Sequence, residues 1–190
     1  MRLLNEKELW SFHDTVLGLL KRHGKRSFEV WGFPSGNIEC ETYEFRGNFG
    51  SLLLGHDSNE EGNRWWIPVN IDRPGRGMHN IAFEMNIPKT SNRTLSVHYA
   101  RDESGDILIL HKGFFTVGYG GVSMDEFFSY YRRNPATWQR TDFDNRQYLL
   151  LGKLKQQSLD ASFLDLISSL AAFARYIAVF KNQYRRNPLA

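Results

Sequence analysis

The sequence predicts an α+β fold: a largely antiparallel sheet of about seven strands with an N-terminal helix, one short inserted helix and a long C-terminal helix. Apolar residues recur at helical spacing near both ends of the 190-residue chain. Between them, short β-branched and aromatic runs alternate with clusters of Gly, Asn and Asp. The connections are too short for parallel crossovers. No Pro- or Ser-rich linker divides the chain, so residues 1–190 are expected to form a single domain.

The N-terminal helix is predicted from its capping residues and its periodicity. Asn5 can cap the helix, and Glu8 follows three residues later, as in a capping box. Gly24 comes directly after a basic last turn, residues 21–23, and suits the position just beyond a helix C-terminus. The apolar positions with helical spacing are Trp10, Phe12, Val16, Leu17, Leu19 and Leu20.

From about Ser27 the period changes to two, which predicts strands. The segment HNIAFEMNI alternates cleanly, since Ile81, Phe83, Met85 and Ile87 face one way and polar or small residues face the other. The segment NIECETYEF alternates less cleanly, so its faces stay unassigned. The other expected strands are SFEVWGF, GSLLLGH, RWWIPVNI, RTLSVHYAR and ILILHKGFF.

Two further helices are predicted in the second half of the chain. Ser123 and Glu126 form a capping box that starts a helix of about ten residues, which ends before Pro135. Residues 137–154 are mixed and predict strand or loop. A final helix is expected from about Leu159 to Tyr184, about 39 Å long at ~1.5 Å per residue. The serines and charges in its apolar run favour a buried globular helix over a membrane span.

Composition narrows the class of protein. Hydrophobic residues make up 41% of the chain and aromatic residues 14%, which suffices for an independent core. Cys40 is the only cysteine, which excludes an intrachain disulfide framework and a multi-cysteine zinc site. The N-terminal sequence has early charges and no apolar segment of signal-peptide length. These features predict a cytoplasmic protein without membrane contact.

The segment VNIDRPGRGMHNIAFEMN contains an acid pair, Asp72 and Glu84, with the spacing of a restriction-type nuclease. Such carboxylates bind Mg²⁺, and a lysine two residues after the second acid supports the attacking water. Asn86 occupies the lysine position, and Lys89 lies beyond Pro88. Asp72 and Glu84 are therefore catalytic candidates without a diagnostic partner. The alternative is that Glu84 and Asn86 lie on the solvated face of a strand.

Other candidate chemistry is less specific. His98 and His111 are expected toward opposite ends of adjacent strands, and no metal-ligand spacing accompanies them. The glycines of GYGGVSMDE precede a helix start, but the segment lacks the Walker lysine and favours a turn followed by a cap. Neither a cofactor nor a metal site is predicted, and whether the protein is an enzyme stays open.

The remaining indication of function comes from arginines that lie beside turns and aromatic residues. The net charge of +3 and the pI of about 9.0 permit contact with nucleic acid without requiring it. Basic segments include residues 21–26 and 185–186. Arginine binds phosphates and exposed rings stack on bases, which favours a nucleic-acid-binding accessory domain, such as one that belongs to a bacterial restriction or defence system. The residues expected to bind are Arg73, Arg76, Trp65, Trp66, Arg132 and Arg133. The alternatives are a protein-binding module, such as an inhibitor or immunity-type protein, and a Mg²⁺-dependent nuclease.

Overall fold

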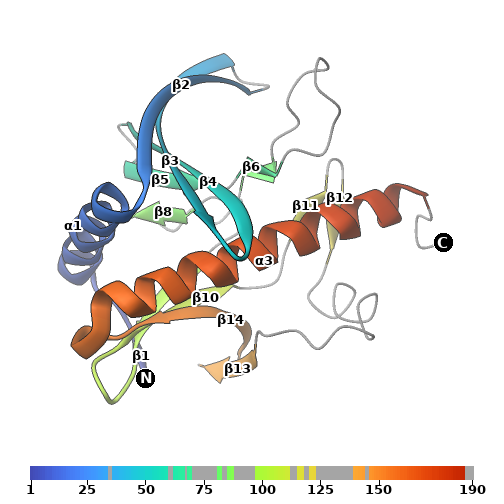
Figure 1. The fold of residues 1–190 in the computed structure, drawn as a ribbon. Helices are drawn as coiled ribbons and strands as arrows, with labels where there is room; N and C mark the ends of the chain where they lie inside the picture. Colours follow the sequence, from blue (N-terminus) through green and yellow to red (C-terminus); the bar gives the residue numbers. More distant parts are fainter. Residues whose placement is uncertain are drawn as a thin grey trace.

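The computed structural model confirms an α+β fold made of antiparallel sheets and helices (Figure 1). The structure describes residues 1–33, 36–59, 62–66, 68–69, 81–82, 85–87, 97–111, 115–117, 120–122, 139–143 and 146–186. Within these ranges lie the N-terminal helix α1 (Glu6–His23) and the C-terminal helix α3 (Leu159–Arg186), which a short 3-10 helix (Gln156–Ser158) precedes. The helix predicted after Ser123 lies outside the described residues.

The described strands form two five-stranded sheets and two smaller pairs. The β3 sheet has the order β2 (Lys25–Phe33), β3 (Gly36–Gly47), β4 (Gly50–Asn59), β5 (Gly62–Trp66) and β8 (Met85–Ile87). The β14 sheet has the order β1 (Arg2–Leu3), β9 (Val97–Arg101), β10 (Ile107–His111), β14 (Arg146–Leu154) and β13 (Gln139–Phe143). The pairs are β6 (Pro68–Val69) with β7 (Ile81–Ala82), and β11 (Phe115–Val117) with β12 (Gly120–Val122).

The prediction of one sheet of about seven strands was therefore wrong in its arrangement. Periodicity identifies a strand but not its partner, because any strand with one apolar face can pair with several others. The β3 sheet begins as a meander of consecutive strands. The β14 sheet instead joins β9 and β10 to β14, which lies far along the chain in a segment whose sequence pattern was mixed. The single domain over residues 1–190 stays a prediction.

Helix α1 begins with the predicted capping box. The Asn5 side chain accepts a hydrogen bond from the Glu8 backbone N–H, and the Glu8 carboxylate accepts one from the Asn5 N–H, each at 3.0 Å. Arg2 pairs with the same carboxylate at 2.6 Å. The hydrogen bond from Arg2, with that from Asn5, lowers the pKa of Glu8 to about 2. These contacts attach the chain terminus to the first turn of α1.

Gly24 ends α1 for a reason other than the one predicted. Its φ of −96° and ψ of 148° are extended, so the position does not need the left-handed conformation that favours glycine. The constraint is space, since a Cβ at Gly24 would lie 2.8 Å from Cζ of Phe45 and 2.9 Å from the carbonyl oxygen of Leu20. Glycine at this position lets the chain turn from α1 into β2 directly against β3.

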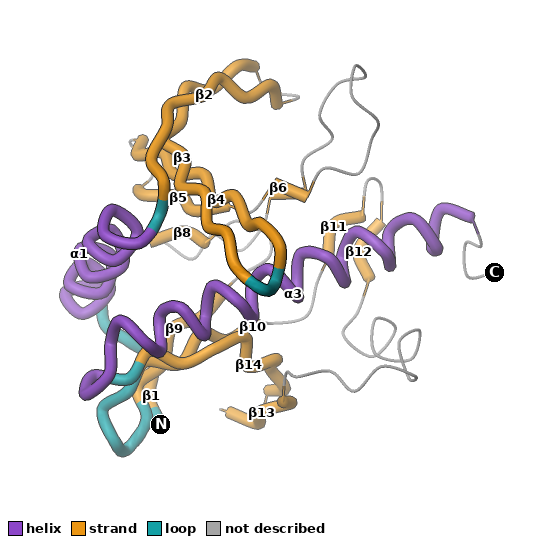
Figure 2. The backbone as a smooth tube through the Cα atoms, in the orientation of Figure 1, coloured by secondary structure: helices purple, strands orange, loops and turns teal. Residues whose placement is uncertain are grey.

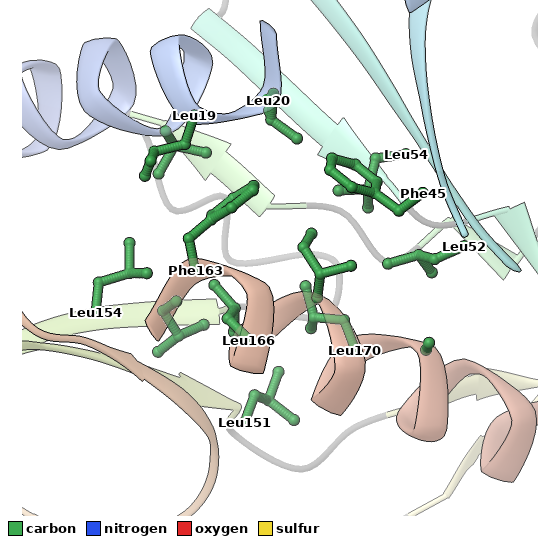
Figure 3. Packing of buried hydrophobic residues seen from close by; sticks show 14 of the residues in the cluster. Leu19, Leu20, Phe45, Leu52, Leu54, Leu151, Leu154, Phe163, Leu166 and Leu170 are labelled. Carbon is green, nitrogen blue, oxygen red and sulfur yellow. The ribbon is translucent and has the colours of Figure 1, made fainter. Parts of the chain in front are cut away.

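Helix α3 packs between the two sheets (Figures 1 and 2). It contacts β14 on one side and β4 on the other. Among the described residues, one core cluster includes residues of α1, β3, β4, β9, β10, β14 and α3, and Figure 3 shows part of it. Phe163, Ile167 and Leu170 recur at helical spacing on α3 and are buried. Within the described part of the chain, no helix is both long and apolar enough to span a membrane.

A bulge in β14 fits this strand to α3. Ile109 pairs with Gly152 and Leu110 pairs with Leu150, so Leu151 is an extra residue on β14. The Ser169 hydroxyl donates a hydrogen bond to the carbonyl oxygen of Leu151. The extra residue shifts the alternation by one position, which places Leu154 in the core where strict alternation from Leu151 would place Lys153.

Substitutions at Gly24 and Gly18 test the close packing between the end of α1 and β3. Gly24→Ala is expected to lower the free energy of unfolding by about 1–3 kcal/mol, because its methyl group would overlap Phe45 and the Leu20 carbonyl. Gly18→Ala is the matched control, since nothing lies within 4 Å of a Cβ at this exposed helical position. It should raise the free energy of unfolding by about 0.5–1 kcal/mol. Urea denaturation measures both, and equal effects of the two substitutions would contradict the packing at Gly24.

Candidate functional site

Most residues predicted from sequence to carry function lie outside the described part of the chain. These are Asp72, Glu84, Arg73, Arg76, Arg132 and Arg133. Trp65 and Trp66 lie on β5, whose backbone is described. Trp65 pairs with His56 and Trp66 pairs with Gly55, so their register positions fall on alternate faces of the β3 sheet. The register position of Trp65 therefore shares a face of the sheet with His56.

A row of directly paired residues crosses the whole β3 sheet at this level. Phe28 pairs with Glu41, Glu41 with His56, His56 with Trp65, and Trp65 with Met85. Directly paired residues of antiparallel strands share a face of the sheet, so five strands contribute one position each to the same face. The polar members, Glu41 and His56, therefore lie between aromatic register positions.

Glu41 is the centre of a polar cluster that also contains Arg26, Tyr43, His56 and His13, here named the Glu41 cluster. Arg26 forms an ion pair with Oε1 of Glu41, and His56 Nδ1 lies 3.6 Å from Oε2. The His13 ring of α1 lies 5.6 Å from the His56 ring, centroid to centroid. Glu41, His56 and His13 are almost completely covered, whereas half of the Arg26 side chain is exposed.

The register of β3 resolves the faces that its sequence leaves open. Glu41, Tyr43 and Phe45 lie on the face that packs toward α1 and α3, and Tyr43 and Phe45 belong to the core cluster. Cys40 and Thr42 lie on the opposite face and are also buried. A charged residue therefore occupies a core-facing position and small residues are buried behind it, which obscures the usual alternation.

Partners and burial act in opposite directions on the Glu41 carboxylate. Burial alone would raise the pKa of Glu41. The hydrogen bond from the Tyr43 hydroxyl, the charge and hydrogen bond of Arg26 and the charge of His56 together outweigh burial, and the pKa lies below its ordinary value. Burial and the hydrogen bond to Glu41 raise the pKa of Tyr43. At neutral pH Glu41 is therefore a fixed acceptor of hydrogen bonds and not a proton donor.

The end of the row at β2 is open to solvent. Phe28 is 71% exposed and Val30 is 59% exposed. The Arg26 guanidinium carbon lies 4.9 Å from the centroid of the Phe28 ring, a cation–π contact. Every residue from Lys25 to Val30 is exposed. Arg26 and Phe28 are here named the Phe28 platform; an exposed ring thus lies beside a cation.

The structure corrects the expected placement of the two histidines on β9 and β10. His98 pairs with Leu110 and His111 pairs with Val97, so both histidines lie at the same end of adjacent strands. They are offset by one register position and therefore fall on opposite faces of the sheet. Among the described residues, no group of three or more His, Cys, Asp or Glu side chains could hold a metal ion.

Sequence reasoning identified only part of this site. Arg26 was noted within the basic segment of residues 21–26, whereas Phe28, Glu41 and His56 were not singled out. The segment KRSFEV places an aromatic residue two positions after an arginine, which puts both on one face of a strand. That spacing was a usable signal for the Phe28 platform. The pairing of Glu41 with His56 depends on the β3–β4 register and had no local signal.

The Glu41 cluster predicts a specific pH dependence of stability. Because the pKa of Glu41 is lower in the folded chain than its ordinary value of 4.5, its stabilising contribution is present above that value and lost as the pH falls through the folded pKa. Glu41→Gln should reduce the free energy of unfolding at pH 7 by about 1–2 kcal/mol, because the neutral amide loses the negative charge that pairs with Arg26 and strengthens the contact with Tyr43.

The measurement is urea denaturation of wild type and Glu41→Gln between pH 7 and pH 3. The difference between the two proteins should shrink below about pH 4.5, where the unfolded wild-type chain begins to protonate Glu41 while the folded chain does not. Glu39→Gln is the matched control, because Glu39 is exposed and lies on the same face of β3. A constant difference across this range, or an equal effect of Glu39→Gln, would contradict the role assigned to Glu41.

Comparisons with known proteins complete the description of the site. No family model, no curated protein and no solved structure matched this chain. The roles of Phe28, Arg26 and Glu41 are therefore argued from their own exposure, contacts and charge. Those observations describe an exposed aromatic ring beside a cation that an ion pair holds in place.

Proposed function

We propose that this protein binds single-stranded nucleic acid, and that the Phe28 platform forms part of the binding surface. The observation that carries the proposal is the Phe28 ring, which is 71% exposed on a strand and lies beside the Arg26 guanidinium. A large apolar side chain so exposed on a strand is typical of a contact surface. Its cationic neighbour, Arg26, favours a polyanion as the ligand.

The chemistry of the platform matches the two parts of a nucleotide. A base can stack on an aromatic side chain, which contributes about 1–3 kcal/mol per base and tolerates any sequence. Arg26 supplies a cation for the phosphates on the same face of the strand as the ring. The ion pair with Glu41 positions Arg26 beside the ring. These contacts favour an unpaired strand, because the bases of a duplex are already stacked on one another.

Trp65 connects this platform to the residues predicted from sequence. Its register position lies in the same cross-strand row as Phe28, three strands away. At about 4.8 Å between neighbouring strands, the two positions are about 14 Å apart. A single strand that crosses the sheet could reach both. The contributions of Arg73, Arg76, Trp66, Arg132 and Arg133, and a place in a restriction or defence system, stay predictions.

Fluorescence anisotropy with two labelled oligonucleotides tests the proposal. One is an oligothymidylate and the other is an abasic strand of the same length, so only base stacking distinguishes them. Wild type should bind the oligothymidylate more tightly, and both affinities should fall as salt rises. Phe28→Leu should weaken binding of the oligothymidylate by about fivefold or more, toward the affinity for the abasic strand.

Two variants serve as controls for the loss of an apolar side chain. Phe28→Tyr keeps a stacking ring and should bind like wild type. Leu164→Ala removes an exposed apolar side chain from α3, at 46% exposure, and should change nothing. Equal binding of both strands by wild type, or no binding at low salt, would refute the proposal. A stoichiometric protein partner that is lost with Phe28→Leu would instead support the protein-binding module.

A further inference from the structure

The outer edge of β2 is the feature that the proposed function does not use. Among the described strands, β2 pairs with β3 alone and therefore forms one edge of its sheet. It lies at the margin of the molecule, away from α3 (Figure 1). Every residue from Lys25 to Val30 is exposed, so neither face of this part of the strand is covered. An open strand edge of this kind is a template for another strand.

The sequence of β2 is complementary to itself in the antiparallel direction. When KRSFE is paired with a second copy about Ser27, Lys25 lies opposite Glu29 of the other copy, and Arg26 lies opposite Phe28. The first pair joins opposite charges, and the second places a guanidinium beside a ring. Antiparallel pairing about a perpendicular two-fold axis keeps each residue on its own face of the sheet.

We infer that this protein forms a homodimer in which β2 pairs antiparallel with β2 of a second copy, about a two-fold axis at Ser27. The interface is isologous, so each favourable pair occurs twice. The occupant of the edge is a second copy because both complementary pairs arise from one short segment of the chain. Pairing would join two β3 sheets into one continuous sheet and place the two Phe28 platforms side by side.

The alternative registers are less complementary. A two-fold axis at Phe28 would place Ser27 opposite Glu29, a pair that joins no opposite charges. An axis at Glu29 would place the two Glu29 carboxylates opposite each other, which is destabilising. The axis at Ser27 is therefore the register that the charges select. Pairing at this edge does not require nucleic acid, so the dimer is expected to form in its absence.

Sedimentation velocity over a range of protein concentrations tests the dimer through its charges. Wild type should dimerise, and Lys25→Glu or Glu29→Lys should each weaken dimerisation by roughly tenfold, because each replaces two attractive pairs with two repulsive ones. The double variant with both substitutions restores opposite charges and should dimerise like wild type. Lys7→Glu, on the exposed surface of α1, is the matched control and should have no effect.

Disulfide formation tests the register directly. Ser27→Cys would place the two cysteines opposite each other, with Cα atoms about 4.5–5.5 Å apart, within the range of about 4.4–6.8 Å that a disulfide spans. Mild oxidation should therefore link two copies of this variant. Val30→Cys is also exposed on β2, but its two copies would lie about 20 Å apart and should not be linked. The native Cys40 is buried, and wild type under the same oxidant gives the baseline.

The outcomes distinguish the dimer from other uses of the edge. A wild type that stays monomeric at all concentrations overturns the inference, even if it binds nucleic acid through Phe28. The inference is also overturned if Lys25→Glu does not weaken dimerisation or if the double variant does not restore it. Oxidation that links Val30→Cys as readily as Ser27→Cys overturns it as well. Restored dimerisation together with selective linkage at Ser27 supports it.

Discussion

The packing of α3 between two sheets is the constraint on which the rest of the structure depends. Phe163, Leu166, Ile167 and Leu170 are all nearly inaccessible, because the helix contacts β14 on one side and β4 on the other. The buried residues form one broad stripe along α3, whereas Ala161, Leu164, Asp165 and Ser168 are exposed on the opposite face. Loss of this packing would expose the inner faces of both sheets, so the helix links two layers that share no strand (Figure 3).

Helices α1 and α3 cover only part of the β3 sheet, which explains why the candidate site is exposed on β2. Tyr43 and Phe45 are buried in the core, whereas Phe28, on the neighbouring strand, is exposed. The β2–β3 ribbon extends beyond α1 and α3 (Figure 2). Glu41 lies at the boundary, opposite Phe28 on one strand and His56 on the other. The polar cluster therefore separates the apolar core from an exposed ring on one continuous face.

The partners of Glu41 at this boundary favour an ionised carboxylate that is fixed in position. Burying a carboxylate is costly unless it is paired and hydrogen-bonded. Glu41 meets this condition through Tyr43 from within the sheet and Arg26 from its solvent side. The same contact positions the Arg26 guanidinium over Phe28. One ion pair thus stabilises the ribbon and shapes the surface proposed to bind nucleic acid.

The sequence by itself determined the local features: the α+β class, the Asn5–Glu8 capping box, the extent of α3 and the strand character of β2 and β9. Each depends on residues close together in the chain, where periodicity and capping chemistry act. Only the tertiary structure decided that the strands divide into two sheets, that Gly24 is required by the approach of Phe45, and that Glu41 meets His56. Strand partners and register follow from contacts between distant segments, and local patterns do not encode such contacts.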